Sequence, residues 1–207
     1  AHPEVAVWGP GIVVPEYLSA APRWISKYFG GMYQQKHVES VCFGVEAGWP
    51  LYYPSGSGMA VQREVMDTYA EGVNNKKITA VGRQGESLSS GEDAQIVWTA
   101  VKMGQAAGTS PTLKLWHLIP GKRLNLAYLK DLQYELGYSY CKGIQEFFPA
   151  KGEELKPLSL PGKVRVILKL LAKSKFKPLL FIRMLVIENA WYSGAKKGWK
   201  EFQEHKS

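Results

Sequence analysis

The chain has 207 residues, 45% of them hydrophobic and 21% charged, a composition that excludes wholesale disorder and suits one domain with an appendage. Its net charge of +8 is unevenly spread: residues 144–207 hold thirteen Lys/Arg against six Asp/Glu, whereas residues 1–143 hold thirteen against twelve. We therefore expect a nearly neutral domain at 1–143 and a basic tail at 144–207, and no nucleic-acid-binding surface over the whole chain.

Cysteine usage and hydropathy indicate the setting of the chain. Cys42 and Cys141 lie far apart, and the sequence has no Cys-x-x-Cys or Cys/His cluster, so neither structural zinc nor a disulfide framework is predicted. A reducing, cytoplasmic setting is the default expectation. The first ten residues lack the pattern of a signal peptide, and the longest apolar stretch, 179–187, is short and contains Arg183, so no membrane span is expected.

The first half of the chain alternates between strand and helix signals. Short β-branched runs at 5–8 and 12–14 predict two strands, or one strand broken at Gly9-Pro10-Gly11. Helical spacing of apolar residues predicts helices over 22–29 and 59–72, and the Gly-, Pro- and Ser-rich stretch 48–58 between them predicts an ordered loop. The order of elements predicts a mixed α/β fold.

A polar loop over 82–91 leads into a predicted helix over 92–104. Residues 112–118 alternate as in a strand, which puts Leu113, Leu115 and His117 on one face. The next apolar repeat predicts a helix from about Leu126 that stops at Gly137.

The tail contains two amphipathic segments, predicted as helices over 164–173 and 178–197. Apolar residues share one face of the first segment, opposite basic positions: Val166, Ile167, Leu170 and Leu171. This face either packs on the domain or lies on an anionic membrane surface, and the composition leaves both readings open.

Ser90-Gly91-Glu92-Asp93 is the first candidate for chemistry. Ser-x-x-Asp fits a capping box, with two acids in the first turn placed favourably against the helix dipole. A carboxylate at such a junction can also act as a general base on a hydroxyl nucleophile. The two interpretations are compatible, because a capped helix start is a rigid place for a base.

His117 and the following turn form the second candidate. A lone histidine on an apolar strand face is more often a core residue than a ligand. Here it leads into Pro120-Gly121-Lys122-Arg123, a tight turn with two cations that suits a diphosphate leaving group, next to an imidazole that suits its metal. The alternative for Lys122 and Arg123 is a solvated turn.

Gly56-Ser57-Gly58-Met59 is the third and weakest candidate. Its outline is that of a phosphate-binding loop, but it matches neither a P-loop nor a dinucleotide fingerprint. Close approach of a ligand and plain tight packing both favour glycines at such positions.

Taken together, these motifs resemble the C-terminal, acceptor-side half of family 2 glycosyltransferases of the GT-A fold, over residues 5–140. The resemblance is carried by Val7 to Pro15, Gly56 to Met59 with Arg63-Glu64, Arg83-Gln84-Gly85, Leu88 to Asp93, and His117 to Pro120 with Arg123-Leu124. It implies a partial GT-A-type mixed sheet flanked by helices, followed by the basic helical tail. It also implies inverting, metal-assisted transfer of a sugar from a nucleotide donor to a glycan or lipid-linked acceptor.

By this resemblance, Asp93 would be the base that deprotonates the acceptor hydroxyl, and Glu92 would shape the acceptor site. His117 would contact the metal, Mn²⁺ or Mg²⁺, or the diphosphate. The remaining substrate contacts would come from Gly56, Ser57, Gly58, Met59, Arg83, Lys122 and Arg123.

The sequence departs from the family in lacking an Asp-x-Asp metal motif, since Asp67, Asp93 and Asp131 are its three aspartates. We therefore expect a fragment, one half of a split enzyme whose N-terminal half is a separate chain, or a chain that has lost catalysis. The start of the sequence within a predicted strand favours the first two. Two alternatives remain: a non-catalytic carbohydrate- or partner-binding module with a membrane-docking tail, and a tail that binds polyanions.

Overall fold

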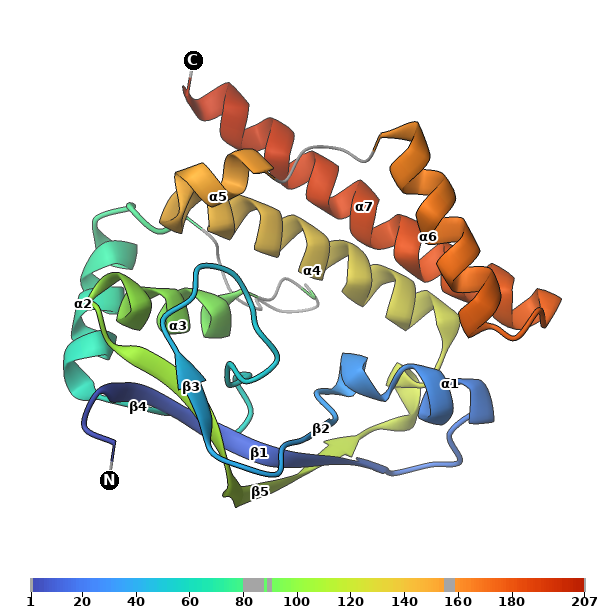
Figure 1. The fold of residues 1–207 in the computed structure, drawn as a ribbon, viewed down its shortest axis with the longest axis horizontal. Helices are drawn as coiled ribbons and strands as arrows, with labels where there is room; N and C mark the ends of the chain where they lie inside the picture. The colour runs from blue at the N-terminus through green and yellow to red at the C-terminus, as the bar shows by residue number, and fades with distance from the viewer. Residues whose placement is uncertain (1, 80–87, 89–90, 155–158, 207) are drawn as a thin grey trace.

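A computed structural model of the chain describes residues 2–79, 88, 91–154 and 159–206. It has an α/β architecture, with a mixed sheet of five strands and helices that flank it (Figure 1). The predicted fold class is confirmed at this level. The strands are β1 (Val5–Tyr17), β2 (Lys36–His37), β3 (Cys42–Gly44), β4 (Ala60–Val61) and β5 (Ala106–Ile119).

The centre of the sheet is a parallel pair, β1 and β5, with β2 and β4 antiparallel to β1 and β3 antiparallel to β5. The predicted interruption at Gly9-Pro10-Gly11 does not divide β1, but the register with β5 shifts between Pro10 and Ile12. A Cβ at Gly11 would lie 2.7 Å from the carbonyl carbon of Ser110, so β5 passes too close for a larger residue. The glycine thus keeps the strand continuous across the irregularity.

Seven α-helices fall in the described part of the chain. They are α1 (Arg23–Tyr28), α2 (Arg63–Asn74), α3 (Glu92–Lys102), α4 (Leu126–Phe147), α5 (Pro149–Glu154), α6 (Leu160–Lys173) and α7 (Pro178–Lys206), with short 3₁₀ turns η1 (Gly30–Tyr33) and η2 (Gly121–Arg123). The helix predicted over 92–104 is confirmed. The helix predicted over 59–72 begins later, at Arg63, because residues 60–61 pair with β1 as β4.

The prediction that the fourth helix stops at Gly137 is wrong. Helix α4 continues for ten more residues, to Phe147, and α7 packs along it (Figure 1). A Cβ at Gly137 would overlap the backbone carbonyl of Trp191, and one at Gly194 would overlap that of Tyr134. Glycine therefore marks a close contact between two helix backbones here, and not a helix end.

The described residues form two hydrophobic cores. The first lies where β1 and β5 pack against α3 and α4. The side chain at its centre is Trp98, 1% exposed, which packs against Phe147 and donates a 2.7 Å hydrogen bond from Nε1 to the carbonyl of Gly48. This bond anchors the first residue of the loop predicted over 48–58 to the middle of α3.

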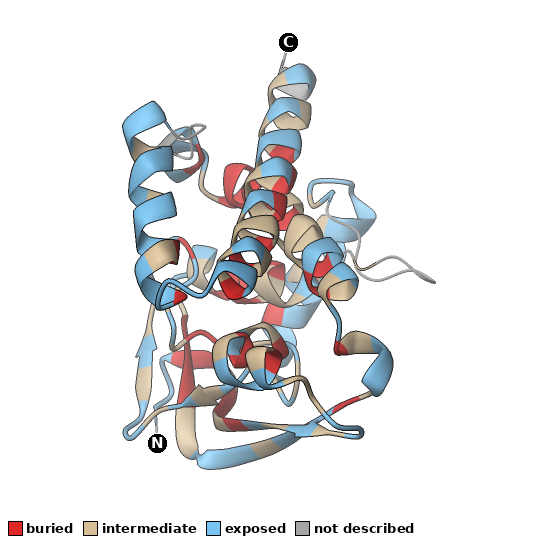
Figure 2. Cartoon of the chain, turned by 90° about the vertical axis from the view of Figure 1, so that its right-hand side faces the viewer, coloured by how far each residue is buried: buried red, intermediate tan, exposed pale blue. Residues whose placement is uncertain are grey.

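The second core joins the tail to the rest of the chain. It combines Ile25, Ile119 and Leu129 from α1, β5 and α4 with tail residues Leu170, Leu180, Met184 and Ile187. The predicted boundary between residues 143 and 144 falls inside α4. Of the two readings of the tail, packing on the domain thus holds for the inner faces of α6 and α7. In Figure 2, α6 is nevertheless exposed over most of its length.

Within the described ranges, no helix combines the length and hydrophobicity needed to span a bilayer.

Candidate functional site

The structure brings two of the sequence candidates into direct contact. The backbone N–H of Gly56 donates a 3.0 Å hydrogen bond to Oδ2 of Asp93, across 37 residues of sequence. The other carboxylate oxygen, Oδ1, accepts a bond of 2.9 Å from the N–H of Ala94. Asp93 is half-buried in the first turn of α3, where the free N–H groups of the helix start favour a negative charge. The loop at 56 and the helix start therefore form one site.

The N-cap of α3 is Gly91, which makes no side-chain capping bond. The predicted cap, Ser90, lies outside the described residues, as does Arg83, the predicted substrate contact. Glu92 occupies the first position of α3 and is exposed to solvent. Asp93 is thus held by the protein on both oxygens, whereas Glu92 projects outward from the same turn.

Two polar residues that the sequence did not single out join this site. The hydroxyl of Tyr69, on α2, donates a 3.3 Å hydrogen bond to Oε1 of Gln95, a side chain that is buried in α3. Burial raises the pKa of Tyr69, and the nearby carboxylates of Glu92 and Asp93 raise it further. The amide Nε2 of Gln95 has no hydrogen-bond partner among the described residues. A neutral hydroxyl and an amide therefore lie beside the carboxylate pair.

The loop Gly56–Met59 also reaches the sheet. Gly58 has a φ of +74°, a left-handed conformation that favours glycine. A Cβ there would lie 3.6 Å from Pro10 on β1 and 3.9 Å from Leu115 on β5. Because Leu115 is two residues from His117 on the same strand, the two side chains share a face. One short loop thus contacts Asp93 at one end and borders the strand of His117 at the other.

His117 is half-buried, and its Nδ1 lies 2.9 Å from the backbone carbonyl oxygen of Tyr33. A carbonyl only accepts, so Nδ1 carries the hydrogen and donates it. A hydrogen on Nδ1 leaves Nε2 as the other ring nitrogen, the one that a metal or diphosphate contact would use. The role predicted for His117 stays a prediction.

The turn after His117 is fixed from two sides. The buried hydroxyl of Tyr33 donates a 2.8 Å hydrogen bond to the carbonyl of Arg123, and burial raises the pKa of that hydroxyl. Asn125 caps α4 and donates from its amide to the carbonyl of Lys122 at 2.8 Å. The Arg123 guanidinium lies 5.9 Å from the ring centre of Tyr128, while Lys122 is exposed. Both cations are therefore mounted on a rigid turn.

Lys36 is a further residue that the sequence did not indicate. It pairs with Val13 across β2 and β1, and Val13 pairs with Leu115, so these side chains share the inner face of the sheet with His117. Its Nζ donates a 2.6 Å hydrogen bond to the carbonyl of Tyr53, and burial lowers its pKa to about 8. No local pattern marks a lone lysine in a two-residue strand, so only the pairing reveals it.

A metal site is not assembled by the described residues alone. They contain no group of three or more His, Cys, Asp or Glu side chains placed to hold a metal ion. His117 can supply one nitrogen, and further ligands would have to come from other residues. We therefore derive no chemical step through a metal from this chain.

One cavity among the described residues lies away from the candidate site. It has a volume of about 480 Å³ and is lined by α2, the C-terminal end of α3 and the end of α4. Lys102 lines it, nine residues and about 14 Å along α3 from Asp93. Its lining includes Lys77 and Ile78, close in sequence to residues 80–87, which the structure does not describe. The contacts around Asp93, and not this cavity, define the candidate site.

Comparisons of the chain with protein-family models, with curated proteins and with solved structures found no significant match.

Proposed function

We propose that this chain supplies the acceptor side and the catalytic base of an inverting glycosyltransferase of the GT-A type, in family 2. The observation that carries the proposal is the hydrogen bond between Gly56 and Asp93. The resemblance implies substrate contacts at Gly56 to Met59 and the catalytic base at Asp93, and the direct contact between the loop and Asp93 supports placing both in one site.

Asp93 suits the role of the base. Among the described residues, each of its oxygens accepts one backbone hydrogen bond, and a carboxylate oxygen can accept a second. These two bonds orient the carboxylate at the start of α3. In the proposed reaction it takes the proton of the acceptor hydroxyl as that oxygen attacks the anomeric carbon, while the nucleoside diphosphate departs from the opposite face.

Positive charge for the departing diphosphate would come from three side chains around the strand end. Lys122 and Arg123 lie on the turn fixed by Tyr33 and Asn125, and Lys36 lies on the inner face of the sheet that His117 shares. Such preorganised cations stabilise the charge that develops on a leaving group. A divalent metal would add Lewis-acid stabilisation of the same charge when bound.

The residues for the nucleotide and the metal are proposed to lie outside these 207. The sequence holds no Asp-x-Asp, and the described residues gather no metal-ligand group. Isothermal titration of this chain with Mn²⁺ and nucleotide-sugars should accordingly show little heat. Tight binding of a nucleotide-sugar to this chain alone would contradict the division of roles.

The decisive test uses the chain with all its native flanking sequence or partner chain. We expect Asp93→Asn to lower the turnover number by about 10²- to 10⁴-fold, the usual contribution of a general base, with acceptor affinity little changed. The matched control is Asp67→Asn, an exposed aspartate of α2, which should leave turnover unchanged. Unchanged turnover in Asp93→Asn would remove Asp93 as the base.

The second candidate function is a non-catalytic carbohydrate-binding module. The observation that favours it is the same contact, since a carboxylate that accepts two backbone N–H bonds also serves as a plain clamp between a loop and a helix. In that case Asp93→Asn would weaken glycan binding without any transfer activity to lose. Nucleotide release in the presence of donor and acceptor separates the two functions.

A further inference from the structure

Helix α6 has two separate apolar faces. Val166 and Leu170 point toward the second core, where Leu170 is buried. A second set follows the spacing i, i+4, i+7, i+8 on a different side of the helix, and all four members are exposed: Leu160, Val164, Ile167 and Leu168. At 100° per residue these four span about 100° of the helix surface and leave Val166 and Leu170 outside their arc. Packing on the second core therefore explains the apolar face with Val166 and Leu170, but it does not explain the exposed apolar face.

The turn after α6 exposes a large aromatic side chain. Lys175 and Phe176 have φ values of 51° and 57°, so both lie in the left-handed region that such residues rarely adopt. Hydrogen bonds from their N–H groups to the carbonyls of Ala172 and Leu171 close the end of the helix. The result leaves Phe176 77% exposed at the corner between α6 and α7. Exposed apolar residues thus continue from the stripe on α6 to the corner.

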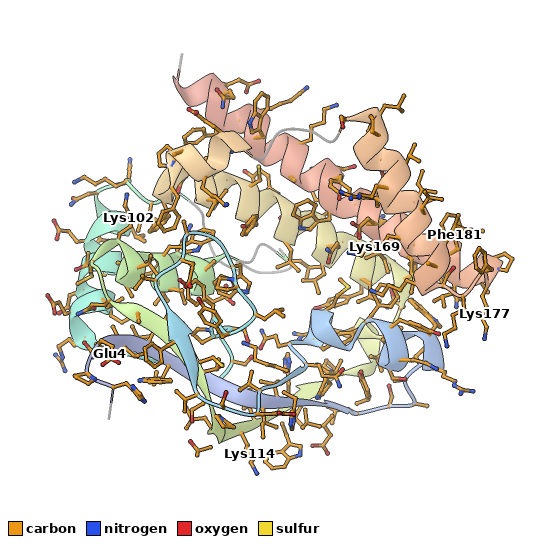
Figure 3. The ribbon with its side chains drawn as sticks, viewed as in Figure 1. Glu4, Lys102, Lys114, Lys169, Lys177 and Phe181 are labelled. Atoms are coloured by element: carbon orange, nitrogen blue, oxygen red, sulfur yellow. The ribbon has the colours of Figure 1, made fainter. Side chains whose placement is uncertain are left out.

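The charged residues around this surface are all basic. Residues 155–187 contain eight Lys/Arg and no Asp or Glu. On the helix, Lys163 lies on one side of the exposed apolar stripe, and Arg165 lies on the other. Lys175 and Lys177 flank Phe176, and Lys177 is at the corner in Figure 3, at the opposite end of the molecule from Lys102. We call Leu160, Val164, Ile167, Leu168 and Phe176, with these flanking basic residues, the α6 surface.

We propose that the α6 surface docks the protein on the interface of an anionic lipid membrane. An apolar stripe with a basic residue on each side, on a helix about 21 Å long, is the pattern of a helix that lies in the interfacial plane. The apolar side chains enter the boundary of the acyl chains, and the basic residues contact the anionic headgroups. The uniform positive charge favours an anionic bilayer over a second copy of this chain, which would bring the same charges together.

This inference goes beyond sugar transfer and does not depend on it, because docking needs neither donor nor acceptor. It also divides the predicted tail into two parts. The inner face of α7 belongs to the second core, through Leu180, Met184 and Ile187, and is not free to meet a bilayer. Membrane contact is left to α6 and the corner that follows it.

The test is flotation of the purified chain with vesicles of phosphatidylcholine alone and of phosphatidylcholine with 30% phosphatidylglycerol (roughly the anionic fraction that generates a strong surface potential). We expect binding to the anionic vesicles and little to the neutral ones. Val164→Glu with Leu168→Glu should weaken anionic-vesicle binding by about tenfold or more, because both side chains would carry charge into the apolar boundary. Arg165→Glu should weaken it by about fivefold or more, since each basic residue near the surface contributes about 1 kcal/mol.

The matched controls lie on the outer face of the sheet, where Trp116 is 61% exposed and Lys114 is also exposed. Trp116→Glu and Lys114→Glu should bind as the parent chain does, and circular dichroism should show that every variant is folded. The proposal is overturned if the parent chain does not bind anionic vesicles at low salt, or if the control variants lose binding and the α6 variants keep it. It is equally overturned if the parent chain self-associates and Val164→Glu with Leu168→Glu abolishes that association without affecting vesicle binding.

Discussion

Gly56 donates its backbone N–H to Oδ2 of Asp93 at 3.0 Å, and this bond connects a loop before α2 to the start of α3. A Cβ at Gly56 would lie 3.4 Å from that of Asp93, so the two residues also touch. The contact gives Asp93 a structural role in addition to its proposed chemical one. The two roles can be separated, because the structural role needs an oxygen that accepts a hydrogen bond, whereas the proposed catalytic role needs a carboxylate that can take a proton.

Asp93→Ala should lower the free energy of unfolding by about 1–2 kcal/mol, because it removes the acceptor of the Gly56 N–H and the negative charge in the first turn of α3. Asp93→Asn keeps an acceptor oxygen and should cost less than about 1 kcal/mol. Urea unfolding followed by circular dichroism measures both. If both variants lose the same stability, the carboxylate charge and not the bond to Gly56 stabilises the loop.

Lys36 provides a prediction with a defined pH range. Burial lowers the pKa of Lys36 from 10.5 to about 8, so the folded chain releases this proton at lower pH than the unfolded chain. Between pH 8 and 10.5 the unfolded state therefore binds more protons, and raising the pH through that range favours the folded state. Because solvent screens the exposed part of this side chain, the free energy of unfolding should change by no more than about 1–2 kcal/mol over this range.

Lys36→Met removes this titration. The stability of the parent chain relative to the variant should rise from pH 8 to pH 10, as measured by urea unfolding at several pH values. Buried tyrosines with raised pKa values have the opposite effect, since their ionisation lowers the free energy of unfolding above pH 10. This effect is the same in the parent chain and in the variant, so it cancels when the two are compared. A difference that stays flat over this range would mean that Lys36 is charged in the folded protein.

Local signals in the sequence were enough to predict α3 and the alternation of β5 from Leu115 onward. Helix α3 begins at the predicted Glu92, where two acids precede an apolar repeat. In β5, Leu115 and His117 are half-buried while Trp116 and Leu118 are exposed, as the alternation predicted. Both features depend on neighbours a few residues apart.

What the sequence did not reveal depends on residues that meet from distant parts of the chain. The strands β2 and β4 are two residues long and exist through their pairing with β1. Lys36 is half-buried at that same pairing, and Gln95 is buried although its side chain is polar. The candidate site shows the same limit, since Gly56 and Asp93 were singled out separately and their contact spans 37 residues.

The corner after α6 offers a prediction on backbone strain. Lys175 has a φ of 51°, which costs a residue with a Cβ about 1 kcal/mol relative to glycine. Lys175→Gly should therefore raise the free energy of unfolding by up to about 1 kcal/mol, although it removes one charge from the α6 surface. Lys173→Gly, within the last turn of α6, should lower it by about 1 kcal/mol. Thermal unfolding of the two variants checks the opposite signs.

The contact between α4 and α7 carries the last prediction. Gly194 faces the backbone carbonyl of Tyr134, and a methyl group there would overlap it, so Gly194→Ala must separate the two helices. Because α7 also supplies Leu180, Met184 and Ile187 to the second core, separation would loosen that core as well. We expect a loss of about 3 kcal/mol in the free energy of unfolding. The control is Gly31→Ala, where a Cβ would meet no atom within 4 Å and φ is not positive, so stability should change by less than about 0.5 kcal/mol. An equal effect of the two substitutions would contradict the contact between α4 and α7 as the source of the cost at Gly194.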